Sequence, residues 1–566
     1  MTAFAPFTIP GGVHPPGHKA ESNTTPIRDM PLLPRYSVPL SQHLGEPATP
    51  CVTVGERVLG GQVIGQPGSG VSAAIHAPTS GRVSAIEARP VAHASGLAAP
   101  CIVIDSDGED AFITTPPPEN EDREAQLTRL RNMGLAGLGG AVFPTHIKLA
   151  PGRNEEWPIL ILNGAECEPW ITCDDRLMRE HPAAILEGAR LIQKLVGAAH
   201  ILIGIEDNKP EAIAALRNAI TDSDGPPVLI CPVPTLYPMG GGKQLAYALT
   251  GRVTPSGGRT TDVGVQMFNI GTAYALQCAL RHGEPLTRRI VTVTGAVQNP
   301  GNFNVRLGTP ISALIAAAGG RTQDACGTLI GGPMMGFELS SDEAPVSKAV
   351  NAVLIKDRRH FPPPSPPLPC IRCGACSRAC PVSLQPFEMH WYARAKDFGK
   401  VQSFNLFDCI ECGCCDYVCP SHIPLVSFFR YAKSEIWARE QEKDAADRAR
   451  LRHEFRSFRL EREKLEKAAK HAAAAAAKSQ KEVVTPPADA PAVDPETARK
   501  KAILAAAMAR ADAARKEIVP KNTEGLPEDK LREITEIDAR RASLLQSVHD
   551  NIKEEEEPSP AKKETP

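Results

Sequence analysis

Long apolar runs are missing from this 566-residue sequence. A helix that spans a bilayer needs roughly 20 consecutive apolar residues, and no window of the chain supplies them. An excess of charge is missing as well, since the formal net charge is −2. This balance gives no reason to expect nucleic acid as a partner, and any association with a membrane is expected to depend on other proteins.

A secretory leader is not recognisable at the start of the sequence. The segment MTAFAPFTIPG has neither the basic region nor the apolar region of a signal peptide, so we expect a reducing compartment without structural disulfides. The sixteen cysteines must then serve another purpose. Nine of them lie between Cys370 and Cys419, and such local clustering is typical of metal ligation.

The length and the changes of pattern along the chain indicate a multi-domain α/β protein. Hydrophobic and charged contents of 42% and 23% are ordinary for soluble domains, and the length is enough for several of them. We expect a β domain at residues 1–120, an α/β domain at 121–285, a small β-grasp unit at 286–360, a helical cysteine-rich domain at 361–440 and a tail at 441–566.

Short apolar segments broken by glycine and proline fill residues 52–105, a pattern typical of strands joined by tight turns. They resemble the barrel-sandwich hybrid fold of biotinyl and lipoyl carriers, in which GERV and APTSGRV strand starts recur. The lysine that such carriers modify is missing between Gly65 and His76. We therefore expect a structural or docking role, without a swinging cofactor.

Apolar segments alternate with helical patterns in the second part, and this βαβα order predicts a largely parallel sheet covered by helices. Residues 288–320 follow as strand, turn, strand and helix, and resemble a β-grasp unit of the SLBB type. The proline-rich stretch 361–369 predicts a stiff spacer. Beyond residue 440 the composition predicts a helical or disordered tail, either simply solvated or docking a partner.

Two complete Cys-x2-Cys-x2-Cys-x3-Cys-Pro runs carry the strongest signal in the sequence. In this spacing the first three cysteines bind one [4Fe-4S] cluster, and the fourth binds the other cluster. Helical apolar spacing between and after the runs indicates a helical ferredoxin-type domain. The expected ligands are Cys370, Cys373, Cys376 and Cys419 for the first cluster, and Cys409, Cys412, Cys415 and Cys380 for the second.

Two structural zinc sites are the alternative, because zinc ribbons also use Cys-x2-Cys pairs. The third cysteine at the same interval, the following prolines, and Gly374 and Gly413 favour iron–sulfur clusters. Cys414 stands outside the spacing and is expected to be a reduced bystander thiol. His390 and His422 are expected to be packing or surface residues, since the eight cysteines of the two runs already complete both clusters.

A glycine-rich string, GLAGLGGAVFPTHIK, occupies residues 134–148. It matches neither a Walker loop nor a dinucleotide-binding fingerprint. The whole string resembles GxGGAxFPTxxK, the flavin mononucleotide (FMN) loop of the flavoprotein subunit of respiratory NADH dehydrogenase. The resemblance implies that Gly137, Gly139 and Gly140 bring backbone N–H groups to the cofactor, and that Lys148 supplies positive charge.

Two further strings match that family in the same order. NGAECEPWITCDDRLMREHP resembles its Asn-Ala-Asp-Glu-x-Glu-Pro segment, which implies cofactor contact by Asn163 and catalytic roles for Glu166 and Glu168 beside flavin and nicotinamide. FNIGTAYAL resembles its Asn-Val-Glu-Thr-Leu segment, which implies cofactor contact by Asn269 and Thr272.

The chain departs from the family at a segment that lines the nucleotide site. The family has paired carboxylates there, in Gly-Glu-Glu-Thr-Ala-Leu, whereas this chain has three glycines followed by Lys243. A lysine beside glycines can hold a phosphate, so Lys243 is included among the expected cofactor contacts.

The order of parts across residues 1–440 resembles the C-type subunit of the Rnf (Rsx) ion-translocating oxidoreductase complex. The resemblance implies a peripheral subunit at the cytoplasmic face of the bacterial inner membrane, with other members of that complex as partners. Its cofactors would be FMN, NAD(H) and two [4Fe-4S] clusters. A nicotinamide passes two electrons as hydride and a cluster passes one, so a flavin between them converts one into the other.

Two other functions are compatible with parts of the pattern. The first is a soluble NADH dehydrogenase flavoprotein-type subunit with another acceptor, which the barrel-sandwich start and the long tail disfavour. The second is an interaction scaffold in which the cysteine domain only organises an assembly, which the flavin-loop string disfavours.

Overall fold

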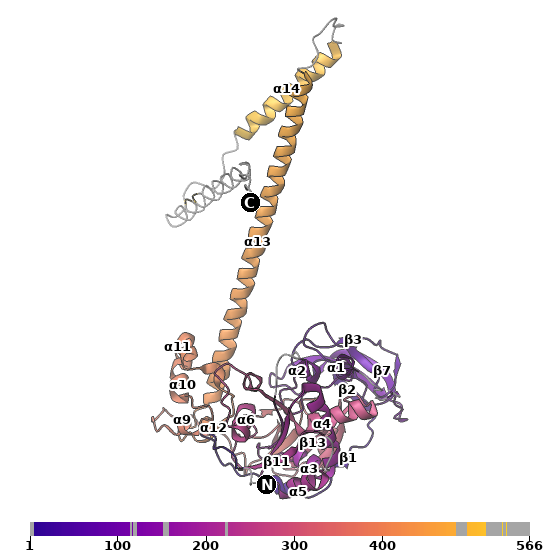
Figure 1. The fold of residues 1–566 in the computed structure, drawn as a ribbon, viewed down its shortest axis with the longest axis vertical. Helices are drawn as coiled ribbons and strands as arrows, with labels where there is room; N and C mark the ends of the chain where they lie inside the picture. The colour runs from indigo at the N-terminus through magenta and orange to yellow at the C-terminus, as the bar shows by residue number, and fades with distance from the viewer. Residues whose placement is uncertain are drawn as a thin grey trace, which may run out of the picture. The chain divides into compact units, whose positions relative to one another are not determined.

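The computed structural model describes residues 5–113, 116, 122–150, 158–220, 225–482, 495–516, 535 and 539. It divides into two compact units, Met1–Ala449 and Arg450–Pro566 (Figure 1). Residues 114–124, whose acidic and proline-containing composition is typical of a linker, lie mostly outside the described residues. Within the described ranges, none of the helices combines the length with the hydrophobicity that a bilayer crossing requires.

The β domain of the first unit contains two antiparallel sheets, with strand orders β2-β8-β7-β4 and β3-β5-β6. A shared core joins the two sheets, with Val38, Ile64 and Ile102 among its buried members. This confirms the expected barrel-sandwich architecture. The strands are β2 (Arg35–Pro39), β3 (Thr49–Pro50), β4 (Arg57–Val58), β5 (Val63–Gln66), β6 (Ile75–His76), β7 (Gly81–Pro90) and β8 (Ala98–Ser106).

The α/β domain is built on a four-stranded parallel sheet in the order β11-β10-β9-β12. Its strands are β9 (Ile159–Gly164), β10 (His200–Glu206), β11 (Val228–Val233) and β12 (Val265–Asn269). Its helices are α1 (Arg123–Asn132), α2 (Thr145–Leu149), α3 (Cys173–Glu180), α4 (Pro182–Val196), α5 (Pro210–Ala219), α6 (Gly242–Thr250) and α7 (Ile270–Gln277).

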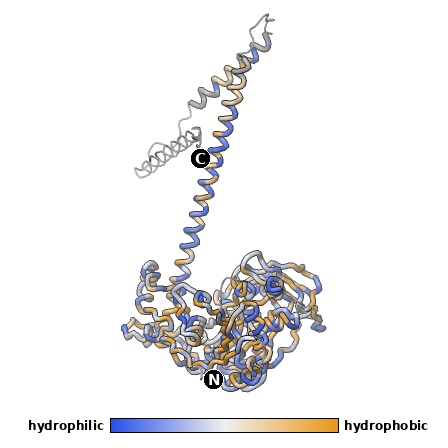
Figure 2. The backbone as a smooth tube through the Cα atoms, in the orientation of Figure 1, coloured by the Kyte–Doolittle hydropathy of each residue, from blue (hydrophilic) through white to orange (hydrophobic). Residues whose placement is uncertain are grey.

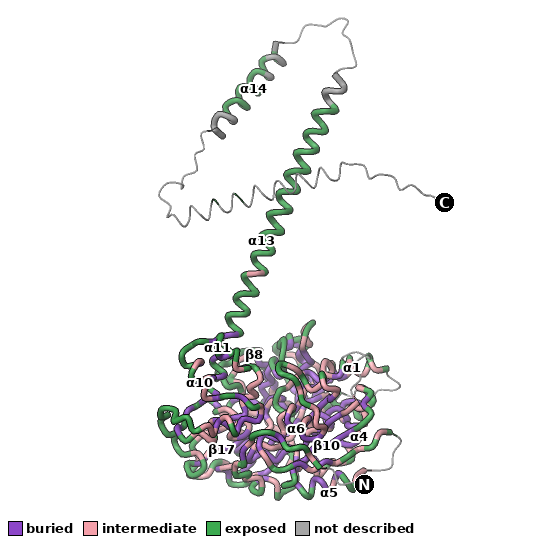
Figure 3. The backbone as a smooth tube through the Cα atoms, turned by 60° about the vertical axis from the view of Figure 1, so that its left-hand side comes forward, coloured by how far each residue is buried: buried purple, intermediate pink, exposed green. Residues whose placement is uncertain are grey.

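Alternating strand residues face two different helical layers. Leu160 and Ile203 belong to a core shared with α1, α3, α4, α5 and α7, whereas Ile161 and Leu202 belong to a second core shared with α6. Because successive side chains of a strand point to opposite faces, the continuous apolar runs noted in the sequence correspond to strands that are buried on both sides. The sheet lies in the buried interior of the unit (Figure 3).

The SLBB-like unit forms a mixed sheet in the order β1-β14-β13-β17-β15-β16, and α8 packs on it. The strand, turn, strand and helix expected at residues 288–320 are present as β13, β14 and α8. The elements are β1 (Arg28–Asp29), β13 (Arg288–Gly295), β14 (Gly301–Arg306), α8 (Ile311–Ala317), β15 (Ala325–Ile330), β16 (Phe337–Glu338) and β17 (Ala352–Asp357).

The cysteine-rich domain is helical and has its own core, to which Met389, Leu406 and Phe429 contribute. The spacer before it has no regular secondary structure, and Leu368 N–H donates to Ser421 O at 2.9 Å. The helices are α9 (Ala375–Ala379), α10 (Pro386–Arg394), α11 (Phe398–Ser403), α12 (Cys414–Tyr417) and the start of α13 (Leu425–Glu482).

An N-terminal arm, residues 5–30, leaves the β domain and packs on the other parts of the first unit. Phe7 N–H donates to the backbone of α6, and Gly12 N–H donates to the last residue of α9, each at 2.9 Å. Val13 and Tyr237 exchange two backbone hydrogen bonds of 2.8 and 3.0 Å. The arm therefore connects the α/β domain to the cysteine-rich domain.

The described part of the second unit is helical. It contains the C-terminal part of α13, which begins in the first unit, and α14 (Pro495–Lys516). Nearly all described side chains of α13 beyond residue 437 are exposed (Figure 3), and hydrophilic residues dominate its surface (Figure 2). The helical tail expected from composition is present over these residues, and the rest of the expected tail lies outside the described part.

Lys348 is a fully buried cation where three parts of the first unit meet. Its ammonium group donates to Ala74 O of the β domain at 3.1 Å and to Gly134 O of the α/β domain at 2.6 Å. Its backbone N–H donates to Gln42 Oε1 at 3.1 Å. Burial lowers the pKa of Lys348 from 10.5 to about 7.

The burial of Lys348 makes folding stability depend on pH. Between pH 7 and 10.5 the unfolded chain binds the lysine proton while the folded chain releases it, so stability rises with pH by up to about 1.4 kcal/mol per unit. We expect the thermal midpoint of the wild type to rise relative to that of Lys348→Met between pH 7 and pH 9. Parallel midpoint curves for the two proteins would contradict a shifted pKa.

Candidate functional site

The strand order creates a crevice at one edge of the α/β sheet. The chain runs from β9 through β10 to β11 in one direction, and β12 then returns to pair with the other side of β9. In such sheets ligands bind beyond the carboxyl ends of the strands where the order reverses. Asn163 and Asn269 lie at those ends of β9 and β12 and are direct partners across the pair. The two expected cofactor asparagines are therefore neighbours at the switch point.

The glycine-rich loop lies over this crevice. Gly137 N–H donates to Phe143 O at 2.9 Å and closes the loop, and Leu138 N–H donates to the Thr272 hydroxyl at 2.9 Å. A Cβ added to Gly139 would lie 3.0 Å from the Cβ of Asn269, whereas one added to Gly140 would meet no atom within 4 Å. The loop thus offers exposed backbone without side chains beside Asn269, which fits the close approach of a flavin and its phosphate.

Hydrogen bonds fix the two asparagines. Asn269 caps α7 by accepting from Gly271 N–H at 2.8 Å, and its amide donates to Asp174 Oδ2 at 2.6 Å. Asn163 donates to Gly240 O at 2.8 Å. Both amides are held in one orientation, as a preorganised binding site requires.

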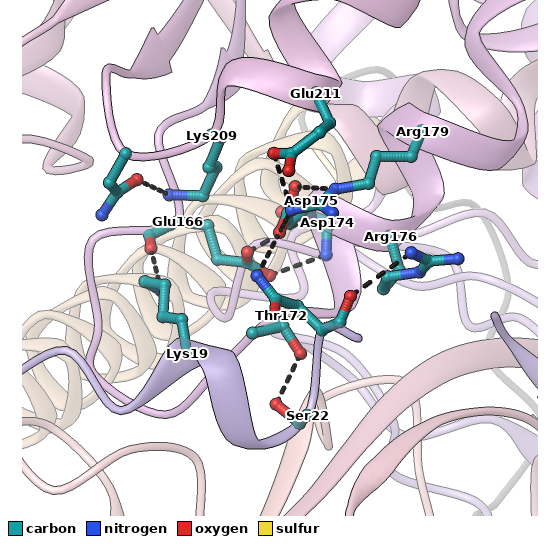
Figure 4. A network of polar contacts seen from close by, with 12 residues as sticks. Lys19, Ser22, Glu166, Thr172, Asp174, Asp175, Arg176, Arg179, Lys209 and Glu211 are labelled. Carbon is teal, nitrogen blue, oxygen red and sulfur yellow. Dashed lines mark hydrogen bonds and ion pairs between the residues drawn. The ribbon is translucent and has the colours of Figure 1, made fainter. Parts of the chain in front are cut away.

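Glu166 lies beside them, at the N-terminus of α3 (Figure 4). Its carboxylate accepts from Asp174 N–H at 2.7 Å and from Asp175 N–H at 3.2 Å, and its backbone has a positive φ of 48°. Burial raises the pKa of Glu166 to about 8, although Lys19 and Lys209 oppose the shift. A carboxyl group with such a pKa can hold or release a proton near neutral pH.

The half-buried Lys19 and the buried Lys209 fix the backbone around Glu166, and no motif in the sequence pointed to either. Lys19 of the arm donates to the carbonyl oxygens of Glu166, Glu168 and Ile171 at 2.7, 3.0 and 2.7 Å (Figure 4). Lys209 donates to Ala165 O at 2.8 Å. The two cations place positive charge beneath the segment that resembles the flavin and nicotinamide region.

Asp174 and Arg289 were also missed from sequence. Burial raises the pKa of the Asp174 carboxyl, and the bond from Asn269 opposes that shift. Arg289, buried in β13, donates to Leu138 O of the glycine loop at 3.4 Å, and burial lowers its pKa. The CDD string after the Glu-x-Glu-Pro segment could have indicated Asp174, because acidic residues favour the first turn of a helix.

Three expected site residues face other partners. The Lys148 ammonium contacts Met267 O and lies 4.7 Å over the Phe268 ring, and burial lowers its pKa to about 8. The other two residues bind parts outside the α/β domain. Glu168 accepts from Met334 N–H at 2.7 Å and Met335 N–H at 3.1 Å in the SLBB-like unit, and Lys243 lies 3.7 Å from Asp408 before the second cysteine run. The structure does not bring these three side chains into the group formed by Asn163, Glu166 and Asn269.

The eight expected cluster cysteines line two cavities in the crossed combination. We call the first the outer cavity, because Cys370 and Cys373 are exposed, and the second the inner cavity. The outer cavity is lined by Cys370, Cys373, Cys376 and Cys419. The inner cavity is lined by Cys380, Cys409, Cys412 and Cys415, and also by Cys414, which stands outside the ligand spacing. In each cavity the four thiols at the expected spacing fit a cubane cluster.

Tyr237 joins the crevice to the inner cavity. Its buried hydroxyl donates to Cys412 O at 2.7 Å, and three residues later Gly240 accepts the bond from Asn163. Burial raises the pKa of the Tyr237 hydroxyl, so it stays protonated and keeps donating. Cys414 is fully buried against Tyr237 O, with its Sγ at 3.9 Å. His390 is buried against Phe428 and lines the outer cavity.

Comparisons with known families agree with this arrangement. Residues 7–109 match the RnfC barrel sandwich hybrid domain, 130–277 the Nuo51 FMN-binding domain, 290–338 the SLBB domain and 368–423 the 4Fe-4S dicluster domain. The chain is 45% identical over 465 residues to the C-type subunit of the ion-translocating oxidoreductase complex of Citrobacter koseri (strain ATCC BAA-895 / CDC 4225-83 / SGSC4696). Over the aligned residues the chain is similar to this C-type subunit.

The alignment with this relative covers 81% of the chain and 65% of the relative, so the chain spans less than two thirds of the relative's length. The matches confirm the expected architecture and the expected cofactor classes, FMN and [4Fe-4S] clusters. They favour clusters over structural zinc.

Two solved structures of an NAD+-reducing [NiFe]-hydrogenase show a distant likeness. In the H2-reduced state the identity is 17% and the TM-score 0.39, over 54% of this chain and 61% of that chain. In the air-oxidized state the values are 19% and 0.37, over 51% and 57%.

Proposed function

We propose that the chain is a peripheral electron-transfer subunit of a membrane-bound, ion-translocating NAD(H)/ferredoxin oxidoreductase complex. In this function it exchanges electrons between NAD(H), FMN and two [4Fe-4S] clusters at the cytoplasmic face of a bacterial inner membrane. One observation carries the proposal: the segment Tyr237–Gly240 hydrogen-bonds to Asn163 in the crevice and to Cys412 in the inner cavity. The two kinds of site therefore share one rigid connection.

The crevice residues would have different roles in binding FMN. Gly139 and Gly140 would present backbone N–H groups, whereas Gly137, whose N–H group already donates to Phe143 O, would shape the loop. Asn163, Asn269 and Thr272 would fix the loop and the cofactor edge. When bound, FMN supplies the exchange between hydride and single electrons.

Glu166 is the group best suited to handle a proton in the crevice, because its pKa lies near neutrality. Lys148, Glu168 and Lys243 have partners within the protein. Lys148 and Lys243 would contact a cofactor, and Glu168 would take a catalytic role, only if their side chains reorient.

The two cavities differ in a way that suggests their order. The inner cavity adjoins Tyr237 and the crevice, while the outer cavity opens at the surface near Cys370 and Cys373. An electron relay needs one centre near the flavin and one near a partner. We therefore assign the inner cavity to the flavin side and the outer cavity to the partner side.

The test is anaerobic purification followed by iron, sulfide, zinc and flavin analysis, with optical spectra before and after NADH. We expect about eight irons and one FMN per chain, and bleaching of both chromophores by NADH. Zinc without flavin would overturn the proposal and favour the scaffold function. Eight irons and bound FMN without any response to NADH would contradict the role in NAD(H) oxidation and reduction.

A further inference from the structure

The two cysteine runs are structural repeats of each other. Residue numbers in the second run exceed their counterparts in the first by a constant offset, and the unusual backbone angles recur. Arg372 and Glu411 have φ values of 55° and 57°, and Gly374 and Gly413 have values of 72° and 80°. The same surface is therefore presented beside each cavity, with different side chains.

The chain covers this surface on the inner run. Ile410 packs into a cluster with Val13 and Tyr237, and Gly413 is so close to the SLBB-like unit that a Cβ would lie 2.8 Å from Met334 O. Cys412 O accepts from the Tyr237 hydroxyl at 2.7 Å. The inner face is thus an interface with the rest of the first unit.

The corresponding positions of the outer run are exposed to solvent. Ile371, the counterpart of Ile410, is 67% exposed, and the neighbouring Leu368 is 59% exposed. A Cβ on Gly374 would meet only the tip of Arg378, at 3.2 Å. We define the outer face by these positions: Leu368, Ile371, Arg372, Gly374 and Arg378.

The charged residues of the two faces also differ, because among the described residues those of the inner face are paired within the chain and those of the outer face are not. Glu411 is neutralised within the chain by Lys433 at 2.8 Å and Arg430 at 2.9 Å. Its counterpart Arg372 is exposed and forms no ion pair with any described residue. Arg378 donates to Cys373 O at 3.2 Å and likewise pairs with no described carboxylate. Residues 358–387 contain no aspartate or glutamate, so the chain itself supplies little negative charge near the outer face.

We propose that the outer face is the docking surface for a second protein domain whose own redox centre lies within an acidic surface. The proposal rests on the proposed function, because it gives the partner side of the relay a location and a charge. Exposed isoleucine and leucine beside unpaired arginines match the apolar centre and charged rim of transient interfaces. The exposed cysteines would be covered when the partner binds, as the inner cysteines are covered by Tyr237 and the SLBB-like unit.

The test measures binding of a plant-type [2Fe-2S] ferredoxin, a small acidic electron carrier, by anaerobic titration calorimetry without NADH. For the double variant Arg372→Glu, Arg378→Glu we expect an affinity loss of about tenfold or more at low ionic strength, and a weaker dependence on salt. Glutamate is compatible with the backbone at position 372, because Glu411 adopts nearly the same φ. Iron analysis checks that both clusters are retained.

The matched control is Lys194→Glu, Arg217→Glu, which changes the net charge equally on exposed positions of α4 and α5. Equal losses of affinity in the two double variants would show that the effect depends only on net charge, and would overturn the proposal. Absence of ferredoxin binding by the wild type would overturn it as well. Co-sedimentation of the wild type, but not the Arg372→Glu, Arg378→Glu variant, with phosphatidylglycerol vesicles in place of ferredoxin binding would assign the face to lipid and overturn the proposal. Failure of the proposed function would appear separately, as a missing optical response to NADH.

Discussion

Replacing Cys412 with alanine is expected to lower the iron content from about eight to about four atoms per chain, because each cluster holds four irons and loses its site with one thiolate. Replacing the adjacent Cys414 is expected to leave the iron content unchanged. Both side chains are buried beside Tyr237, and only Cys412 fits the ligand spacing. The pair therefore separates ligation from packing at neighbouring positions.

The crossed ligation of the two clusters can be tested in the same way. Cys380 belongs to the first run in sequence, yet it lines the inner cavity. We expect Cys380→Ala to remove the same low-temperature electron paramagnetic resonance signal as Cys412→Ala, and Cys419→Ala to remove the other signal. Loss of the same signal in Cys380→Ala and Cys373→Ala would contradict the crossed arrangement.

Replacing Gly137 with leucine is expected to abolish FMN binding without unfolding the α/β domain. Its φ lies outside the left-handed range, and an added Cβ would approach only Phe143, at 3.6 Å from its carbonyl oxygen. The side chain would then fill the space above the crevice that the flavin needs. Flavin fluorescence released from the denatured protein measures FMN content, and circular dichroism checks the fold.

Gly399→Leu is the matched control for this variant, because Gly399 also tolerates a Cβ, with its nearest contact at 3.9 Å, and lies in α11 of the cysteine-rich domain. It should retain FMN. Gly140→Leu would be less informative, since its φ of 109° makes any side chain strained. Full FMN retention by Gly137→Leu would rule out this loop as the flavin site.

Sequence patterns were most informative where the signal is local. The alternation of apolar segments and helical patterns predicted a parallel sheet covered by helices, and the cysteine spacing predicted which thiols would meet around each cavity. The two asparagines were found through resemblance, and the strand order explains why they meet. Each of these features depends on a few consecutive residues or on the order of strands.

Contacts between distant segments could not be inferred in this way. Lys19 and Lys348 donate to backbone carbonyl oxygens of remote segments. Every residue type has a backbone carbonyl, so the sequence does not show which residue will accept such a bond. Glu168 matched a position of the family motif, but its side chain binds the SLBB-like unit. Lys243 stands where the family has a different segment, and its side chain pairs with Asp408. A motif specifies the backbone position of a residue, and packing between domains decides which way its side chain turns.

The N-terminal arm has a consequence for how the chain reaches this structure. Residues 5–30 are synthesised before the segments that they contact, and the backbone partner of Gly12 lies at the end of α9, separated from it by more than half of the chain. Gly11 lies so close to Cys380 that a Cβ there would be 2.5 Å from its carbonyl oxygen. Contacts of such long sequence separation form late in folding. The arm therefore has no complete binding surface during most of synthesis, and the first unit closes only after the first cysteine run has left the ribosome.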